Sequence, residues 1–374
     1  MNYYIVLEIL FIILTIFFCI KKSNIIINLI PIIDYPNERK FHKKPTPLIG
    51  GIIALILFFE IFLFENDSNI RNIDFQILMI SSIVFFIGLG DDLKDFNPYF
   101  KLLSVGILLI IFFYLFPYFK IEKLYFETLN KTLTLNEISL FFSLLCILLL
   151  LNALNMSDGV NGLFLGIIII FFTYIELSYD QNKILSLLII FSLIILFVLN
   201  FKNYFFMGDS GVYFLTIFFS FSLINSYHSV ESNIKSIEEI FILLMIPGID
   251  MFRVFLERLR KGINPLKPDR THLHHLLLSF FSEKLVLFIY FNMILLPLVV
   301  NQFKILNMSS IIVTFSILYL IIIYKLKSKL DKKSRLLSGC CFDCHLEIEH
   351  EMKLNGTYKD YERNRIITNA NSYL

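Results

Sequence analysis

Apolar residues occur in long runs along nearly the whole chain, and short polar segments separate these runs. Most runs are about 15 to 20 residues long, enough for a slightly tilted helix to cross a ~30 Å hydrocarbon core. They lack the alternation of polar and apolar positions that membrane β-strands require, so we predict helices. Eleven spans are expected, at residues 3–20, 48–64, 76–90, 102–117, 138–153, 162–178, 184–200, 211–226, 239–250, 285–301 and 308–325.

The ninth predicted span, residues 239–250, is the shortest of the set, because Pro247 and Gly248 are expected to end its helix. A polar segment, residues 328–374, follows the last span and is expected to form a cytoplasmic tail behind a transmembrane domain of residues 1–327. We therefore predict an all-α, polytopic integral membrane protein with about eleven transmembrane helices.

The composition agrees with this class. Hydrophobic residues make up 57% of the chain and charged residues 17%, and the mean hydropathy is +0.73. Soluble domains average about 45–50% apolar residues and about 25% charged residues. A soluble globular protein is therefore disfavoured. The net charge of +2 gives no reason to expect binding to nucleic acid.

Basic residues are distributed unequally between the two sets of loops. Loops on the side of Lys21 carry sixteen Lys and Arg residues, the opposite loops carry seven, and the tail adds ten to the first side. The positive-inside rule makes the first side cytoplasmic, with the N-terminus outside. The chain also lacks the basic leader of a cleavable signal peptide, so the first span is expected to be retained.

The polar motifs with chemical potential all fall on the predicted cytoplasmic side. They are DYPNERKFHKKPTPLIGG, GDDLKD, NALNMSDGVNGL, NFKNYFFMGDSG and PDRTHLHH. The outer loops, such as ENDSNIRNID and HSVESNIKSIEE, look like ordinary polar connectors. One face of the membrane is therefore expected to carry the chemistry.

Three carboxylates stand next to predicted span ends. Asp91 and Asp92 are adjacent on a helix and point in different directions, so we expect different partners, one a cation and the other a proton. Gly208 and Gly211 flank Asp209 and allow it to approach Mg²⁺ and phosphate. The alternatives are interfacial charges that end a helix and a simple turn between spans.

Two further polar segments have chemical and structural interpretations. Four polar side chains of NALNMSDGVNGL could hydrogen-bond a nucleobase or sugar, or could form hydrogen bonds with each other at helix ends. These residues are Asn152, Asn155, Asp158 and Asn161. In the motif KKPTPLIGG, two prolines and two glycines surround Lys44 and Thr46, which is moderately suggestive of anion binding.

Three histidines, His272, His274 and His275, follow Arg270. If the segment is helical, His272 and His275 share a face and His274 points elsewhere. The HExxH spacing of a zinc protease is missing, so phosphate binding with Arg270 is the favoured interpretation. In the tail, CCFDCH is a weak zinc candidate, and ordinary reduced thiols are favoured there.

Metal-binding carboxylates, cationic donors and polar groups would thus meet where cytosol touches hydrocarbon. This layout suits a reaction between a soluble, phosphate-bearing donor and a membrane-held acceptor. A secondary transporter of an anionic solute is the main alternative, but it would place its charges near the bilayer midplane. A metalloprotease or lipid phosphatase would leave the Asp91–Asp92 pair and the FMGDSG turn without a role.

The five motifs, in this order over residues 31–278, resemble the polyprenyl-phosphate N-acetylhexosamine-1-phosphate transferase family. The HLHH sequence is similar to the branch that starts O-antigen, enterobacterial common antigen or teichoic acid linkage units, rather than to phospho-MurNAc-pentapeptide transferase. The resemblance implies transfer of a HexNAc-1-phosphate, by default GlcNAc-1-phosphate, from a UDP-sugar to undecaprenyl phosphate with release of UMP. It also implies Mg²⁺, with Mn²⁺ as an alternative, and a bacterial inner membrane; a homodimer is left open.

The resemblance also assigns roles to residues. Asp91 and Asp92 match the family's DD pair, and Asp209 matches its Mg²⁺-binding carboxylate, so Asp91 and Asp209 are the implied metal ligands and all three are catalytic candidates. The implied substrate-binding set is Lys44, Thr46, Lys101, Asn152, Asn155, Asp158, Asn161, Asn200, Arg270, His272, His274 and His275.

The chain departs from the family pattern at two places. Asn161 stands where the family usually has Asp in DGxDG, which affects one nucleotide or sugar contact. The segment NFKNYFFMGD lacks the usual Ala-Lys, so the supporting amide before the turn is either Asn200 or Asn203.

Overall fold

The computed structural model describes residues 2–30, 32–34, 45–64, 68–179, 184–262, 264 and 270–338. The predicted anion-binding residue Lys44 and the tail cysteines 340, 341 and 344 lie outside these residues. The chain divides into two compact units, Met1–Tyr319 and Leu320–Leu374. All the contacts discussed below belong to the first unit.

Eleven helices in the described residues coincide with the eleven predicted spans. They are α1 (Asn2–Lys21), α3 (Gly50–Phe64), α4 (Ser68–Lys94), α5 (Pro98–Leu115), α6 (Ser139–Ser157), α7 (Leu163–Leu177), α8 (Ile184–Phe201), α9 (Gly208–His228), α10 (Ile237–Arg260), α12 (Glu283–Gln302) and α13 (Met308–Ser338). Among the described residues, seven helices are long and apolar enough to cross a membrane, and α3 and α7 are shorter apolar helices. A helix satisfies every backbone polar group internally, as hydrocarbon demands. The protein is an all-α, polytopic membrane protein.

The remaining elements are short. They are helices α2 (Ser23–Leu29) and α11 (Leu273–Leu278), the 3₁₀ turns η1 (Pro117–Phe119) and η2 (Asn136–Ile138), and strands β1 (Ile33–Asp34), β2 (Thr46–Pro47), β3 (Lys123–Phe126) and β4 (Lys131–Thr134). Strands β1 and β2 pair antiparallel, with Asp34 opposite Thr46, and β3 and β4 form a hairpin with Phe126 opposite Lys131.

Helix α10 continues through Pro247 to Arg260, so the prediction that Pro247 and Gly248 end the ninth helix is wrong. A proline inside a helix removes one backbone hydrogen bond and typically costs about 3 kcal/mol. Contacts on both sides of Pro247 hold the helix together. The Ser236 side chain caps the first turn by accepting a hydrogen bond from the Glu239 N–H, and Asp250 and Arg253 anchor the second half.

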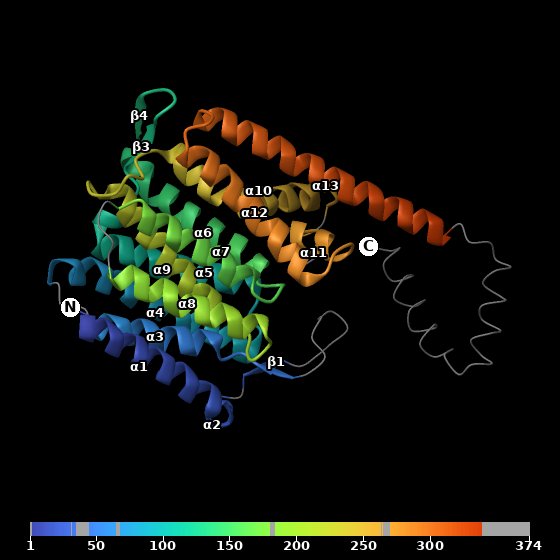
Figure 1. Ribbon diagram of the computed structural model, residues 1–374. Helices are drawn as coiled ribbons and strands as arrows, with labels where there is room; N and C mark the ends of the chain where they lie inside the picture. The colour runs from blue at the N-terminus through green and yellow to red at the C-terminus, as the bar shows by residue number, and fades with distance from the viewer. Residues whose placement is uncertain are drawn as a thin grey trace, which may run out of the picture. The chain divides into compact units, whose positions relative to one another are not determined.

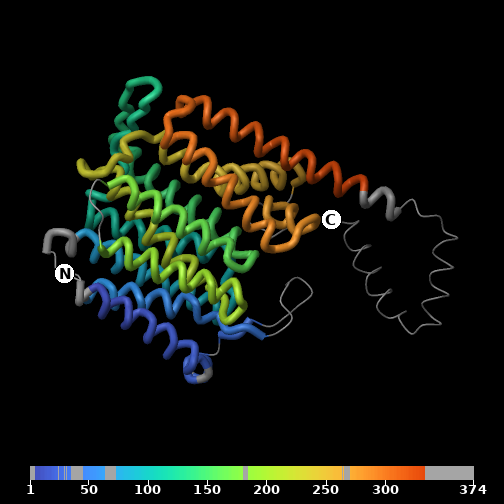
Figure 2. Tube along the Cα trace, in the orientation of Figure 1, coloured from blue at the N-terminus to red at the C-terminus, as the bar shows by residue number. Residues whose placement is uncertain are grey.

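Helix α9 is the centre of the bundle. Nearly every residue from Ser210 to Ser226 is buried, and α4 makes the most extensive contact with it (Figure 2). Glycines permit this close approach: a Cβ on Gly88 would lie 2.6 Å from the Asp209 carbonyl oxygen, and one on Gly51 would lie 2.4 Å from the Gly211 nitrogen. Helices α3 and α4 therefore both contact the first turn of α9 closely.

The two ends of the bundle differ in character. The β3–β4 hairpin lies at one end, whereas β1 and α11 lie at the other (Figure 1). At the hairpin end, the Tyr125 N–H donates to the Tyr227 hydroxyl, and the Glu238 carboxylate accepts from the Glu127 and Thr128 N–H groups. These bonds join β3 and the turn after it to the end of α9 and the start of α10.

A labelling experiment tests the predicted orientation. In a variant without the five native cysteines, a cysteine at the exposed Asn130 should react with an impermeant maleimide in intact cells. A cysteine at the exposed Lys94 should react only after permeabilisation. The charge bias of the loops is the physical reason for this expectation, and the opposite pattern of labelling would contradict the orientation.

Candidate active site

Asp92 caps the first turn of α9. Its carboxylate accepts hydrogen bonds from the Asp209 N–H at 2.8 Å and the Ser210 N–H at 3.1 Å, which are otherwise unpaired donors at a helix start. Gly208 has a φ of +69°, and a Cβ there would lie 2.6 Å from Asp92 Oδ2. Only glycine fits this turn, which places the Asp209 side chain beside the end of α4.

Asp91, Lys101 and Asp209 form an ionic cluster beside this turn. Lys101 Nζ donates to Asp209 Oδ2 at 3.0 Å and forms an ion pair with Asp91 Oδ2. Asp91 is buried and also accepts from the Phe96 N–H at 2.6 Å. Asp91 and Asp92 therefore have different partners, as their adjacent positions on a helix predicted.

The chain between α4 and α5 delivers Lys101 to this position. The Asn97 side chain accepts a hydrogen bond from the Tyr99 N–H, and Pro98 occupies the first position of α5, a combination that favours a helix start. Lys101 follows in the first turn of α5, so its ammonium group reaches both Asp91 and Asp209. Two carboxylates from different helices thus converge on one cation.

Asn200 joins the loop after α6 to the loop before α9. The buried Asn200 Oδ1 accepts from the Gly162 N–H at 2.7 Å, and its Nδ2 donates to the Phe205 carbonyl at 2.9 Å. The exposed Asn203, with a φ of +61°, instead accepts a hydrogen bond from the half-buried Asn161 side chain. Of the two amides considered from the sequence, Asn200 is the one that supports the turn.

Replacing Asn200 by Ala should destabilise the fold. The change leaves the Gly162 N–H and the Phe205 carbonyl without partners in a buried setting, at a cost of about 1–3 kcal/mol each. Thermal unfolding of the purified protein should show a clear loss of stability. Asn161→Ala, which removes only an exposed side-chain bond, is the matched control, and equal melting of the two variants would contradict this role of Asn200.

Asp158 lies directly after α6, between the acidic cluster and the histidine segment. Burial, together with the negative charges of Asp209 and Asp92, raises the pKa of its carboxyl group well above its usual range. A Cβ on the next residue, Gly159, would lie 3.3 Å from both His274 Nε2 and His275 Cε1. The loop after α6 therefore brings the histidines within reach of the carboxylates.

The histidines are arranged differently from the prediction. Helix α11 begins at Leu273, and His272 is its N-cap, with extended backbone angles. His272 and His275 therefore do not share a helical face; instead the His272 and His274 rings stack, with centroids 5.8 Å apart. The reason lies in α10, because the Asp250 carboxylate accepts from the Leu273 N–H and thereby sets the start of α11.

Two of the histidines are almost completely buried. His272 is 4% exposed and His274 is 1% exposed. Burial and the neighbouring His275 and His272 hold the pKa of His274 well below its usual range, so its ring is neutral near pH 7. Within the described residues, the Nε2 atoms of His272 and His274 have no hydrogen-bond partner.

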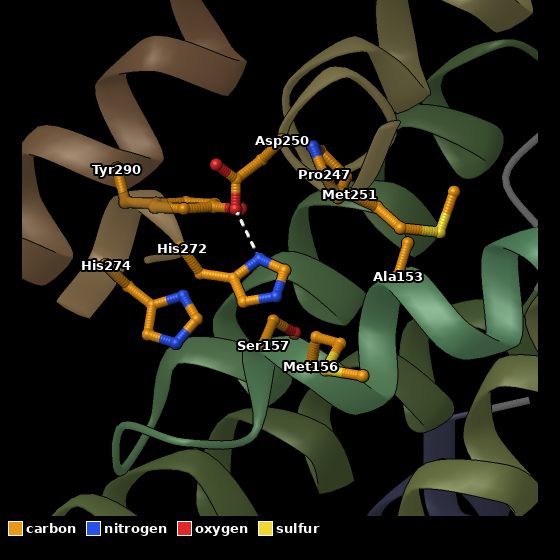
Figure 3. A pocket seen from close by; sticks show the side chains of 9 residues that line it. All are labelled: Ala153, Met156, Ser157, Pro247, Asp250, Met251, His272, His274 and Tyr290. Atoms are coloured by element: carbon orange, nitrogen blue, oxygen red, sulfur yellow. Dashed lines mark hydrogen bonds and ion pairs between the residues drawn. The ribbon is translucent and has the colours of Figure 1, made fainter. Parts of the chain in front are cut away.

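A small recess lies between these histidines, the end of α6 and the middle of α10 (Figure 3). Figure 3 shows the His272 ring between the Asp250 carboxylate and the side chains of Met156 and Ser157. Asp250 Oδ2 lies 2.9 Å from His272 Nδ1. The complete lining comprises Ala153, Met156, Ser157, Pro247, Asp250, Met251, His272, His274 and Tyr290.

Comparison with known proteins now separates the possible classes. Residues 75–227, which contain the acidic cluster, match the model described as glycosyl transferase family 4. This segment is similar to that family. The prediction made from the five motifs is confirmed, and the protein is a membrane protein of the transferase class.

Several bacterial relatives match over most of the chain. Undecaprenyl-phosphate alpha-N-acetylglucosaminyl 1-phosphate transferase of Escherichia coli strain K12 is 28% identical over 268 residues, covering 66% of this chain and 69% of the relative. The protein of the same name from Salmonella typhi is 27% identical over 288 residues (72% and 74%). That from Haemophilus influenzae is 27% identical over 266 residues (67% and 72%).

The other residues predicted for the candidate site take separate positions. Thr46 is buried in β2, and β2 is followed by bonds from the Gly50 and Gly51 N–H groups to the carbonyls of Phe206 and Met207. This places PTPLIGG, residues 45–51, beside FMGDSG. Asn152 and Asn155 are half-buried on the last turns of α6, and Arg270 is exposed ahead of α11.

The sequence analysis missed Asp250, although a carboxylate within IPGIDMFRVF is an available signal. A buried acid in an apolar segment calls for a partner, and Arg253 lies three residues later, on the same helical face. The signal was overlooked because Pro247 was expected to end the helix. Asp250 contacts the histidine segment and is thus part of the candidate site.

Proposed function

We propose that the protein transfers an N-acetylhexosamine-1-phosphate, by default GlcNAc-1-phosphate, from a UDP-sugar to undecaprenyl phosphate and releases UMP. The observation that carries this proposal is the convergence of Asp91, Asp209 and Lys101 at the start of α9, next to Asp158. The names of the bacterial relatives support the acceptor and the transferred group.

The acidic cluster fits a magnesium ion. Mg²⁺ prefers one or two carboxylates with phosphate oxygens and water, and Asp91 and Asp209 direct oxygens at one cation position. Groups of three or more His, Cys, Asp and Glu ligands are absent from the part of the chain that the structure describes, which argues against a zinc cage there. Asp91 and Asp209 would hold the ion, which would neutralise charge on the donor diphosphate; Mn²⁺ could replace it.

Residues of the chain itself supply the other functions that the proposed reaction needs. Lys101, which would leave the position between the two carboxylates when the ion binds, supplies a positive charge suited to the acceptor phosphate. Asp92 fixes the first turn of α9 and so keeps Asp209 in place. Transfer joins an acceptor phosphate oxygen to the β-phosphorus of the donor and breaks the bond from that phosphorus to UMP. Positioning and electrostatics account for most of the catalysis of such reactions.

The loop after α6 and the histidine segment are the proposed donor side. Asn152, Asn155 and Asp158 offer hydrogen bonds to the nucleoside and sugar, and Asn161 has its side chain engaged with Asn203. The donor phosphates would meet the histidines and Arg270, where imidazole and guanidinium groups gather. We place this site on the cytoplasmic side of a bacterial inner membrane.

A secondary transporter is less compatible with this arrangement. Transporters hold their coupling charges near the middle of the membrane, in helices that break there. Here the acidic cluster lies where α4 ends and α9 begins, and α9 continues unbroken to His228. The position of the charges therefore favours a reaction at the membrane surface.

An assay of UMP release tests the proposal directly. Purified protein in nanodiscs should release UMP from at least one UDP-N-acetylhexosamine, only when undecaprenyl phosphate and Mg²⁺ are both present. A carrier-linked sugar diphosphate should form in equal amount. Failure of every UDP-sugar tested to yield that product, from folded protein with both substrates and metal, would overturn the proposal.

A further inference from the structure

The Asp250 carboxylate is the centre of a buried network that joins three helices. Oδ1 accepts hydrogen bonds from Arg253 Nη2 at 2.8 Å, the Tyr319 hydroxyl at 2.6 Å and the Leu273 N–H at 3.1 Å. Oδ2 lies 2.9 Å from His272 Nδ1. A second bond from Arg253, to the Thr271 carbonyl at 2.7 Å, holds the segment that leads to His272.

This arrangement of donors decides which nitrogen of His272 carries its proton. A carboxylate paired with a guanidinium group is ionised and can only accept hydrogen bonds. The short Oδ2–Nδ1 contact therefore requires a proton on Nδ1. In the neutral ring, Nε2 is then a bare acceptor, and in the protonated ring it is a charged donor.

The other nitrogen of His272 points into the recess at the end of α6. The ring lies between Asp250 and the end of α6, as Figure 3 shows. His272 is 4% exposed, and its Nε2 has no hydrogen-bond partner among the described residues. A buried polar atom without a partner is costly unless a ligand or water satisfies it.

We propose that Asp250 is a positioning residue: it accepts a hydrogen bond from His272 Nδ1 and thereby turns Nε2 toward the donor diphosphate, where the Nε2–H donates to a phosphate oxygen. This inference rests on the proposed function for the identity of the anion. Because Nδ1 donates to Asp250, a donor at Nε2 requires a ring that carries both protons, and the Asp250 carboxylate balances its positive charge. Asp250 would therefore strengthen donor binding without touching the donor.

Asp250→Asn reverses this arrangement with almost no change in size. Three donors point at Oδ1, so the amide oxygen is expected to take that position and the amide N–H to face His272 Nδ1. The ring must then accept at Nδ1 and carry its proton on Nε2. The variant also replaces the negative charge of the carboxylate beside the ring by a neutral amide.

Nitrogen NMR of histidine-labelled protein in nanodiscs measures the site of protonation without any substrate. The chain has seven histidines, and a spectrum of His272→Gln assigns the signal of His272. Above the titration range of the ring, wild-type His272 should be protonated on Nδ1, and in Asp250→Asn on Nε2. Protonation of wild-type His272 on Nε2 would overturn the proposal, even if Asp250→Asn fails to fold.

Steady-state kinetics supply the functional test. Asp250→Asn should raise KM for the UDP-sugar roughly 10- to 100-fold, the range found when a group that orients a metal-bound histidine is removed, and leave KM for undecaprenyl phosphate near wild type. In a His272→Gln background the same change should have no further effect on donor KM, because Asp250 acts through His272. An additive effect, or an unchanged donor KM in folded Asp250→Asn, would refute the proposal.

Tyr319→Phe is the matched control for the network. It removes one bond to Asp250 Oδ1 and the acceptor of Arg253 Nε, and leaves the His272 contact in place, so the His272 signal and donor KM should stay near wild type. Equal donor KM changes in Tyr319→Phe and Asp250→Asn would show a general structural effect instead. A wild-type protein that releases no UMP would defeat the proposed function alone, since the NMR result needs no turnover.

Discussion

Asp209→Asn is expected to abolish transfer while the protein still folds and enters the membrane. The amide can still accept a hydrogen bond from Lys101, and Asp92 still caps the backbone N–H of residue 209. What is lost is the negative charge that would hold the metal ion. Removing one group that stabilises a transition state costs about 10²–10³-fold in kcat, and initial rates of UMP release at saturating Mg²⁺ measure the loss.

Asp95→Asn is the matched control for this change. Asp95 lies just after α4, is exposed, and has a φ of +46°, a conformation that Asn also adopts readily. The same chemical change at this nearby position should leave turnover near wild type. Near-normal turnover by folded Asp209→Asn would count against both the metal site and the transferase assignment.

Lys101→Met is expected to make stability depend on Mg²⁺ and to reduce transfer strongly. Lys101 is the cation between Asp91 and Asp209, so its removal leaves two carboxylates directed at the same point. Repulsion between them should lower the melting temperature of the metal-free protein, although partial exposure of Lys101 and Asp209 weakens the effect. A divalent ion that replaces the ammonium group restores stability by binding only the folded state.

Thermal unfolding with and without Mg²⁺ measures this dependence. Lys101→Met should gain more stability from Mg²⁺ than wild type does, since Lys101 no longer competes for the two carboxylates. Lys94→Met removes an exposed lysine from the last turn of α4 and is the control. A melting curve of Lys101→Met that responds to Mg²⁺ as weakly as that of Lys94→Met would argue against a cation site at Asp91 and Asp209.

The positions of the helices could be predicted because each apolar run must form its own hydrogen bonds in hydrocarbon. That requirement is local, so it depends on the run and not on its neighbours. The prediction that Pro247 ends a helix is wrong because contacts with distant residues, which a local pattern does not show, hold the helix together. A proline weakens a helix locally, and contacts made by Asp250 and Arg253 with Thr271, Leu273 and Tyr319 keep α10 continuous.

The candidate site also has features that the sequence predicted and features that only the tertiary structure decided. Chain order alone indicated that Asp91, Asp92, Asp158 and Asp209 face one side of the membrane, because each lies at a span end on that side. Adjacent positions on a helix also implied separate partners for Asp91 and Asp92. Motif resemblance then identified the family, which the match over residues 75–227 confirmed.

Packing between distant segments decided which side chains are in contact. Lys101 and Asp209 are 108 positions apart, and Asn200 and Gly162 are 38 apart. The glycine contact between α4 and α9, together with the turn from α4 into α5, brings the first pair together, and nothing in either local sequence specifies that distance. Likewise, Asp250 on α10 starts α11 one residue after His272, which turns an expected helical face into a stacked pair of rings. Local chemistry thus selected the residues, and long-range packing selected their partners.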